Sequence, residues 1–350
     1  SAPEGDAYLV LEDQPLVIRL SRAGSVEWAR GFSRDPYAFG GMEVHDSASS
    51  EDGTLFLAGA FSPSEGGDER GFLMSVGADG EANWLRSWRH DFFVERQRVA
   101  VTADRVFVAD QVPGSNEIDR RQVLLAFDHD GGEIAQTAAV MNSFDGPIAA
   151  FSWVAIAADG NGVRLFGTRS NARDGSFDVS LGVLAFDANL TLQSQNATRV
   201  VLDGFRAAPI HEVVALSDGS WAVLGTIGEA PALFHAVTGG PAIAYQLVGE
   251  GGEPALIDDE DYLLRGVADS EGGILLAGSA EMPGDVTLTP FDVQTTSLGV
   301  SLSDPGLEVF TDVVTGEESS DVPTASADEA GALDMPESGD EDVIILHFGL

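Results

Sequence analysis

Short stretches of alternating apolar and polar residues recur along the chain, separated by turns rich in glycine and aspartate. The clearest example occupies residues 71–76, continues through the turn Ala78-Asp79-Gly80 and resumes at Trp84. Alternation with a period of two is typical of a strand with one buried face, and Gly80 can adopt positive φ without steric cost. Few stretches have the apolar spacing of a helix, so the pattern predicts an all-β chain.

Seven copies of this strand can be aligned at intervals of 50 to 59 residues: 16–20, 72–76, 123–127, 183–186, 232–236, 287–291 and 344–348. A second hairpin motif precedes most copies, as at 51–59 and 217–225. In it, an Asp-Gly or Gly-Gly turn leads into an apolar strand that often ends in glycine. Together the two motifs give four strands per repeat. A four-stranded repeat of roughly 50 residues is typical of a β-propeller blade.

The units at 72–84 and, more loosely, at 16–28 resemble the tandem repeats of secreted bacterial β-propellers of the PQQ-like and related kinds. The resemblance covers nearly the whole chain and implies a ring of four-stranded blades. Five full repeats and two incomplete ends predict six blades, with seven as the alternative. Ring closure removes exposed sheet edges. We therefore expect the strand at 344–348 to pair with the N-terminal strands, making residues 1–350 a single domain.

The charge of the chain changes this picture more than its other bulk properties. Asp and Glu number 57 against 18 Lys and Arg, which gives a formal net charge of −39, and all 18 basic residues are Arg. Such a charge repels nucleic acids and anionic membranes, so we expect neither as a partner. The same charge favours binding of divalent cations or basic proteins, or else solubility in a medium of high salt.

Other features of the sequence indicate where the protein is located. No run of about 18 apolar residues predicts a membrane-spanning helix. The lack of cysteine excludes disulfides and thiolate zinc sites. The start Ser1-Ala2-Pro3-Glu4 is typical of the end left by signal cleavage. We expect an extracellular or cell-surface protein, with the periplasm as the alternative.

Arginine and aromatic residues concentrate between positions 84 and 121. The candidate binding residues there are Trp84, Arg86, Trp88, Arg89, Arg96, Arg98, Arg120 and Arg121. Guanidinium groups stack on aromatic faces and bind carboxylates through paired hydrogen bonds. In one interpretation the aromatics are core residues and each Arg pairs with local acids. In the other they recognise an acidic protein partner or the acidic segment of a second copy, which would give head-to-tail self-assembly.

Negative charge gathers in residues 304–342, which hold 13 acidic residues and no basic one. We expect a solvated acidic loop or insertion before the closing strand, or else a docking surface for cations or a basic partner. Carboxylate oxygens that would suit calcium occur in two further groups, for which a plain turn or loop is the alternative: Asp128, Asp130 and Glu133, and Asp258, Asp259 and Asp261. We predict no other cofactor.

Motifs of catalysis are missing from the sequence. It has no Gly-x-Ser-x-Gly motif and no sialidase box, and its six histidines show no metal-binding spacing. We therefore predict a non-enzymatic binding or structural component of a surface, matrix or filament. The alternative is a secreted propeller enzyme that acts on glycans or is a quinone-dependent dehydrogenase. A catalytic pair of carboxylates would be hidden among the 57 acids.

Overall fold

The regular structure of the described residues is entirely β, as the alternation predicts. In the described residues, 27 strands form six antiparallel sheets, and no helix occurs. The computed structural model describes residues 7–11, 16–21, 23, 25–34, 42–61, 70–89, 97–113, 120–141, 151–173, 176–202, 207–215, 221–227, 230–236, 242–248, 265–268, 273–279, 287–291, 294–295, 300–312, 314–318 and 343–349.

Consecutive strands build the six sheets, which we call A to F in chain order. Sheet A contains β1 (Ala7–Leu11), β2 (Leu16–Leu20) and β3 (Val26–Arg34). Sheet B contains β4 (Met42–Ser49), β5 (Leu55–Phe61), β6 (Arg70–Val76) and β7 (Ala82–Arg89). Sheet C contains β8 (Arg98–Val101), β9 (Val106–Pro113), β10 (Arg120–Phe127) and β11 (Glu133–Met141).

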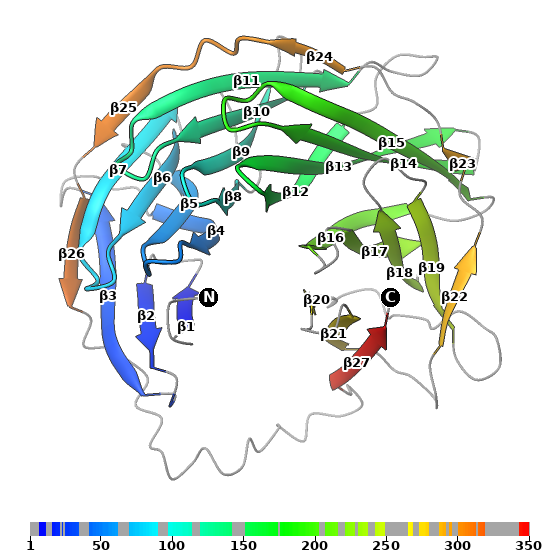
Figure 1. Ribbon diagram of the computed structural model, residues 1–350, viewed down its shortest axis with the longest axis horizontal. Coiled ribbons are helices and arrows are strands. Elements are labelled where there is room, and N and C mark those ends of the chain that lie inside the picture. The colour runs from blue at the N-terminus through cyan, green and yellow to red at the C-terminus, as the bar shows by residue number, and fades with distance from the viewer. Residues whose placement is uncertain are drawn as a thin grey trace.

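The remaining sheets repeat the same order of strands. Sheet D contains β12 (Phe151–Asp159), β13 (Gly162–Arg173), β14 (Ser176–Phe186) and β15 (Leu192–Leu202). Sheet E contains β16 (Ala207–Ala215), β17 (Trp221–Ile227), β18 (Ala230–Ala236) and β19 (Ala242–Val248). Sheet F contains β20 (Arg265–Ala268), β21 (Gly273–Ser279) and β27 (Val343–Gly349). Figure 1 shows the sheets following one another around an arc, with sheets A and F on either side of the remaining gap.

A later segment returns along the outside of this arc. Its strands are β22 (Thr287–Phe291), β23 (Gln294–Thr295), β24 (Val300–Ser303), β25 (Val309–Asp312) and β26 (Val314–Glu318). They pair in turn with β19, β15, β11, β7 and β3, the outer strands of sheets E, D, C, B and A (Figure 1). We call residues 287–318 the strap. It is inserted between β21 and β27, which are neighbours in sheet F.

Packing between sheets explains why several strands are apolar on both faces. All seven residues of β5 are buried. Leu57 packs in a cluster with residues of sheet A, whereas the adjacent Phe56 packs with residues of sheet C. A third cluster joins sheets C and D and includes Phe107 and Leu165. The inner strands β4, β8, β12, β16 and β20 also lie beside one another in order. Sheets A to D are thus joined to their neighbours by these hydrophobic clusters.

The glycine that often ends the second strand of a repeat meets the backbone of the first strand. A Cβ on Gly59 would lie 1.9 Å from the carbonyl oxygen of Glu43. Gly59 faces Val44 at the β-bulge of β4. Gly167 and Gly225 occupy the same position beside the bulges of β12 and β16. Only glycine permits this close approach of two strands.

All seven aligned copies lie within strands, but two predictions about them are wrong. The copy at 287–291 is the first strand of the strap and not the third strand of a repeat. The strand at 344–348 does not close the ring by pairing with N-terminal strands, since β27 pairs with β21. β27 has seven residues and pairs with all seven residues of β21. A full-length partner satisfies every backbone group along the edge.

The acidic segment 304–342 differs from the expected loop in its first half. Residues 309–312 and 314–318 are strands of the strap. Residues 319–342 lie outside the described part of the chain. In the described part, no helix is suited to crossing a membrane.

Candidate functional site

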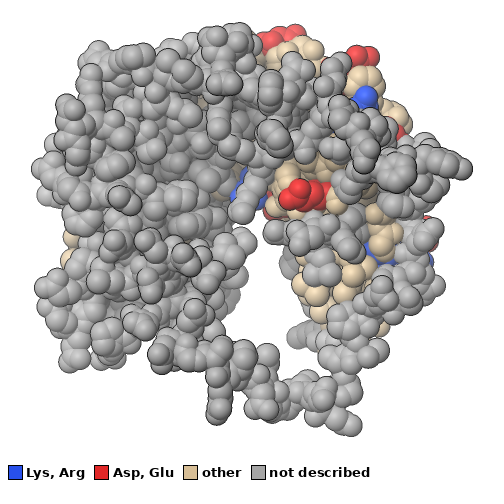
Figure 2. All heavy atoms as spheres, turned by 180° about the vertical axis from the view of Figure 1, so that it is seen from behind, with Lys and Arg blue, Asp and Glu red and all other residues tan. Residues whose placement is uncertain are grey.

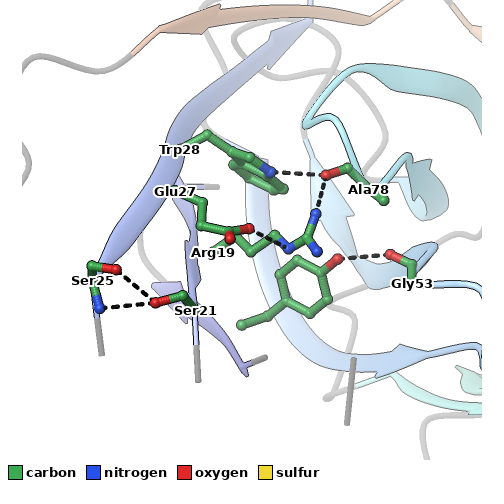
Figure 3. Close-up of polar contacts among 8 residues, drawn as sticks. Arg19, Ser21, Ser25, Glu27, Trp28, Gly53 and Ala78 are labelled. Carbon is green, nitrogen blue, oxygen red and sulfur yellow. Dashed lines mark hydrogen bonds and ion pairs between the residues drawn. The ribbon is translucent and has the colours of Figure 1, made fainter. Parts of the chain in front are cut away.

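The first joint between sheets is made by side chains of sheet A that bind backbone oxygens of sheet B. The indole Nε1–H of Trp28, on β3, donates a 2.9 Å hydrogen bond to the carbonyl oxygen of Ala78. Arg19 donates from Nη1 to the same oxygen over 2.6 Å, and Figure 3 shows both side chains converging on it. The hydroxyl of Tyr8 donates to the carbonyl oxygen of Gly53 over 2.7 Å. Two turns of sheet B are therefore held by sheet A.

Ion pairs surround this joint. The Nε atom of Arg19 lies 3.0 Å from Oε2 of Glu27 on β3 (Figure 3). Arg30, two residues after Trp28, places Nη2 at 3.3 Å from Oε1 of Glu81 in the next sheet. Exposed ion pairs contribute little stability, so they orient the arginines more than they hold the sheets together.

A second joint repeats the first between sheets B and C. Trp84, on β7, donates from Nε1 to the carbonyl oxygen of His129 over 2.9 Å. Arg86 donates from Nε to the carbonyl oxygen of Gly131 over 2.7 Å. The guanidinium carbon of Arg86 lies 5.6 Å from the centre of the Trp84 ring, within the range of a cation–π contact. A Trp-x-Arg sequence therefore docks on the following sheet at both positions.

Glycine makes the surface on which each tryptophan lies. Gly80 and Gly131 have φ values of +82° and +80°, in the left-handed region. A Cβ on Gly80 would lie 3.0 Å from the ring of Trp28, and one on Gly131 would lie 2.7 Å from the ring of Trp84. Each turn thus needs glycine for its backbone conformation and for the approach of the indole.

The predicted binding residues divide into several groups. Trp84 and Arg86 use their polar atoms in the joint. Trp88 is fully buried and donates from Nε1 to Oδ2 of the buried Asp110 over 2.7 Å. Arg98 donates from Nη1 to the carbonyl oxygen of His45 over 3.3 Å. For Trp88 the core interpretation is correct, whereas binding of a partner by the others stays a prediction. Not described are Arg96 and the side chains of Arg89, Arg120 and Arg121.

Polar side chains also connect the inner strands β4 and β8. The carboxylate of Asp46 accepts a 2.9 Å hydrogen bond from the backbone N–H of Val99. The side-chain amide of Gln97 contacts Nδ1 of His45. Both contributing residues of β4 lie at its β-bulge, which redirects side chains toward β8. The geometry therefore accounts for this cluster as a link between two sheets.

Side chains of sheets B and C anchor the strap. The Gln136 amide donates from Nε2 to the carbonyl oxygen of Leu307 over 3.0 Å and accepts from its N–H over 2.9 Å. The Ser87 hydroxyl donates to the carboxylate of Asp312. The guanidinium carbon of Arg70 lies 4.5 Å from the centre of the Phe310 ring. These contacts add side-chain specificity to the backbone pairing of the strap.

The first predicted calcium site has the geometry of a turn. Oδ1 of Asp128 accepts a 2.6 Å hydrogen bond from the N–H of Gly132. In the described residues, no group of three or more His, Asp or Glu side chains is arranged to hold a metal ion. Calcium at Asp128, Asp130 and Glu133 therefore stays a prediction without further support. The second group, Asp258, Asp259 and Asp261, lies outside the described residues.

Two turn aspartates have pKa values below the ordinary 3.8. For Asp52 the main cause is the Ser50 hydroxyl, and the N–H of Thr54 adds to it. For Asp187 the main cause is the N–H of Thr191. Figure 2 shows described acidic side chains both at the outer rim and toward the middle of one face. The lowered pKa values mean that Asp52 and Asp187 stay ionised to a lower pH than an ordinary aspartate.

Comparison with known proteins gives no family: no family model matches the chain, and no curated protein matches it. Function is therefore inferred from the sheets, the strap and the charge. Sequence reasoning missed the strap and the roles of Tyr8 and Gln136. The repeated Trp-x-Arg at 28–30 and 84–86 was the available signal for the joints.

Proposed function

We propose that the chain is a closed six-bladed β-propeller that serves, outside the cell or at its surface, as a non-enzymatic structural or binding component. The observation that carries the proposal is the strap. It adds a strand to the outer edge of five sheets and so links them independently of the core. Opening the ring would require breaking both sets of contacts. Such reinforcement suits a protein whose work is to keep its shape.

The order of the sheets supports closure of the ring. Inner strands follow one another from β4 to β20, and β1 lies beside β4. Packing of sheet F against sheet A would complete the circle without any pairing of terminal strands. Three hydrophobic clusters already join sheet A to B, sheet B to C and sheet C to D in this order.

The net charge of −39 supports a basic partner. A field of one sign attracts oppositely charged surfaces over a distance of about 10 Å at moderate salt and weakens as salt is added. A basic protein, or cations that bridge copies, would therefore be recruited by the acidic surface.

An experiment separates this role from the enzyme alternative. The full chain is titrated with an arginine-rich peptide and a matched acidic peptide at low and high salt, and in parallel with pyrroloquinoline quinone plus Ca²⁺ and a panel of glycans. We expect salt-sensitive binding of the basic peptide alone. Saturable binding of the quinone or of a glycan, followed by turnover, would overturn the proposal.

A further inference from the structure

The strap is separable from the sheet in which its two ends are anchored. Strands β21 and β27 pair in register over seven residues, from Gly273 with Gly349 to Ser279 with Val343. Sheet F therefore needs no strand of the strap. Residues 319–342 connect the strap to β27 and can reach about 80 Å when extended, at about 3.3 Å per residue. The other connection, residues 280–286, reaches about 25 Å, so the strap can leave its sheets without disturbing sheet F while β22 stays within that distance of β21.

Each pairing of the strap is short. Strand β23 has two residues, β24 and β25 have four, and β22 and β26 have five. The five pairings act in series, so loss of one end weakens the hold on the next. The edges left behind would be the outer strands β3, β7, β11, β15 and β19. An open edge of this kind is a template for another strand.

We propose that the strap exchanges between copies, so that the strap of one chain occupies the outer edges of a second chain. A second copy is the best occupant because it carries the same strap. It offers Leu307 to the Gln136 amide, Asp312 to Ser87 and Phe310 to Arg70 in the registers already present. An unrelated strand would offer only its backbone. Exchange of an identical element therefore loses no contact.

The outcome of exchange depends on its symmetry. Reciprocal exchange between two chains gives a closed dimer, whereas exchange passed from chain to chain gives an open filament. The proposal concerns the strap alone and holds whether or not the protein is a scaffold. A failure of strap exchange would leave the binding of basic partners intact, so the two proposals fail separately.

The absence of cysteine makes a direct test available. Ala139 on β11 and Leu302 on β24 are Cα partners. Opposite residues of an antiparallel pair lie about 4.5–5.5 Å apart, which a disulfide can bridge. The single variants A139C and L302C are mixed, unfolded together in urea, refolded and oxidised. As the control, A139C is mixed with N189C, whose cysteine lies in an exposed turn of sheet D.

We expect a disulfide-linked A139C–L302C dimer in clear excess over the A139C–N189C control. The double variant A139C/L302C, oxidised before unfolding, keeps its own strap and stays monomeric. If A139C does not fold, G31C mixed with E317C replaces the pair, because a Cβ at Gly31 meets nothing within 4 Å and Glu317 faces it. A mixed dimer no more abundant than the control, while the double variant crosslinks within one chain, would overturn the proposal.

Discussion

The indole nitrogen of Trp84 and the carbonyl oxygen of His129 lie 2.9 Å apart across the boundary between sheets B and C. The same contact joins Trp28 to Ala78 across the boundary between sheets A and B. A tryptophan that donates to a turn of the next sheet and covers its glycine fixes the relative position of both sheets. We therefore expect substitutions in these joints to lower the free energy of unfolding.

Replacing Trp84 with phenylalanine should weaken the second joint. The ring remains, but the hydrogen bond to His129 is lost, which should cost about 1 kcal/mol of unfolding free energy. Urea denaturation followed by circular dichroism measures the change. The control is I134A, an exposed residue of β11 in sheet C, for which we expect a change within about 0.5 kcal/mol. Equal effects of W84F and I134A would show that the joint adds no stability.

Replacing Gly131 with alanine tests whether the indole requires glycine beneath it. The variant G131A suffers the left-handed φ of +80°, and its Cβ would lie 2.7 Å from the Trp84 ring. The matched control is G160A, where φ is +58° and a Cβ would meet nothing within 4 Å. The backbone penalty of about 1–2 kcal/mol applies to both. We expect G131A to lose more stability than G160A in the same urea titration, and equal losses would contradict the packing shown here.

Acid should destabilise the protein partly through Asp52. The hydrogen bond from Ser50 lowers the pKa of Asp52 below 3.8, so the unfolded chain takes up the proton first as the pH falls. The stabilising contribution is fully present above about pH 3.8 and is lost as the pH drops through the lowered pKa of the folded state. The variant D52N lacks this pH-dependent stabilisation. Its urea midpoint should therefore fall less than that of the wild type as the pH drops below about 3.8. Parallel midpoint curves would exclude a role for Asp52.

Replacing Gln136 with leucine should loosen the strap without harming the core. The change removes both hydrogen bonds to the backbone of Leu307, worth about 1–2 kcal/mol together. Amide hydrogen exchange should become faster in residues 300–312 and stay unchanged in β5 and β6. I134A again serves as the control, since its side chain points to solvent on the same strand. Uniform acceleration across all sheets would mean that the strap does not open separately.

The sequence predicts strands well where their apolar pattern repeats. It does not predict which position a strand occupies within its sheet. The alternation at 287–291 is as regular as that of other copies, but β22 lies at an outer edge. A period of two shows which residues share a face and says nothing about which strand is the neighbour. The sequence predicts a loop at β25 and β26, because the acidic residues around them obscure a short apolar pattern.

The contacts between sheets could not be predicted from the sequence. The pattern includes Trp84 and Arg86 among eight candidate binding residues, and it leaves open whether these residues bind a partner or serve the core and local ion pairs. Trp84 and His129 are 45 residues apart in the sequence, and only the fold brings them into contact. Gln136 and Leu307, separated by 171 residues, carried no signal at all.

The strap is the central structural claim, and its last strand tests it most directly. Gly31 and Glu317 are Cα partners at the far end of the strap. Oxidation of the variant G31C/E317C in dilute solution should give a monomer in which peptide mapping finds one disulfide joining the two cysteines. A monomer that stays fully reduced under the same conditions, while remaining folded by circular dichroism, would contradict the account.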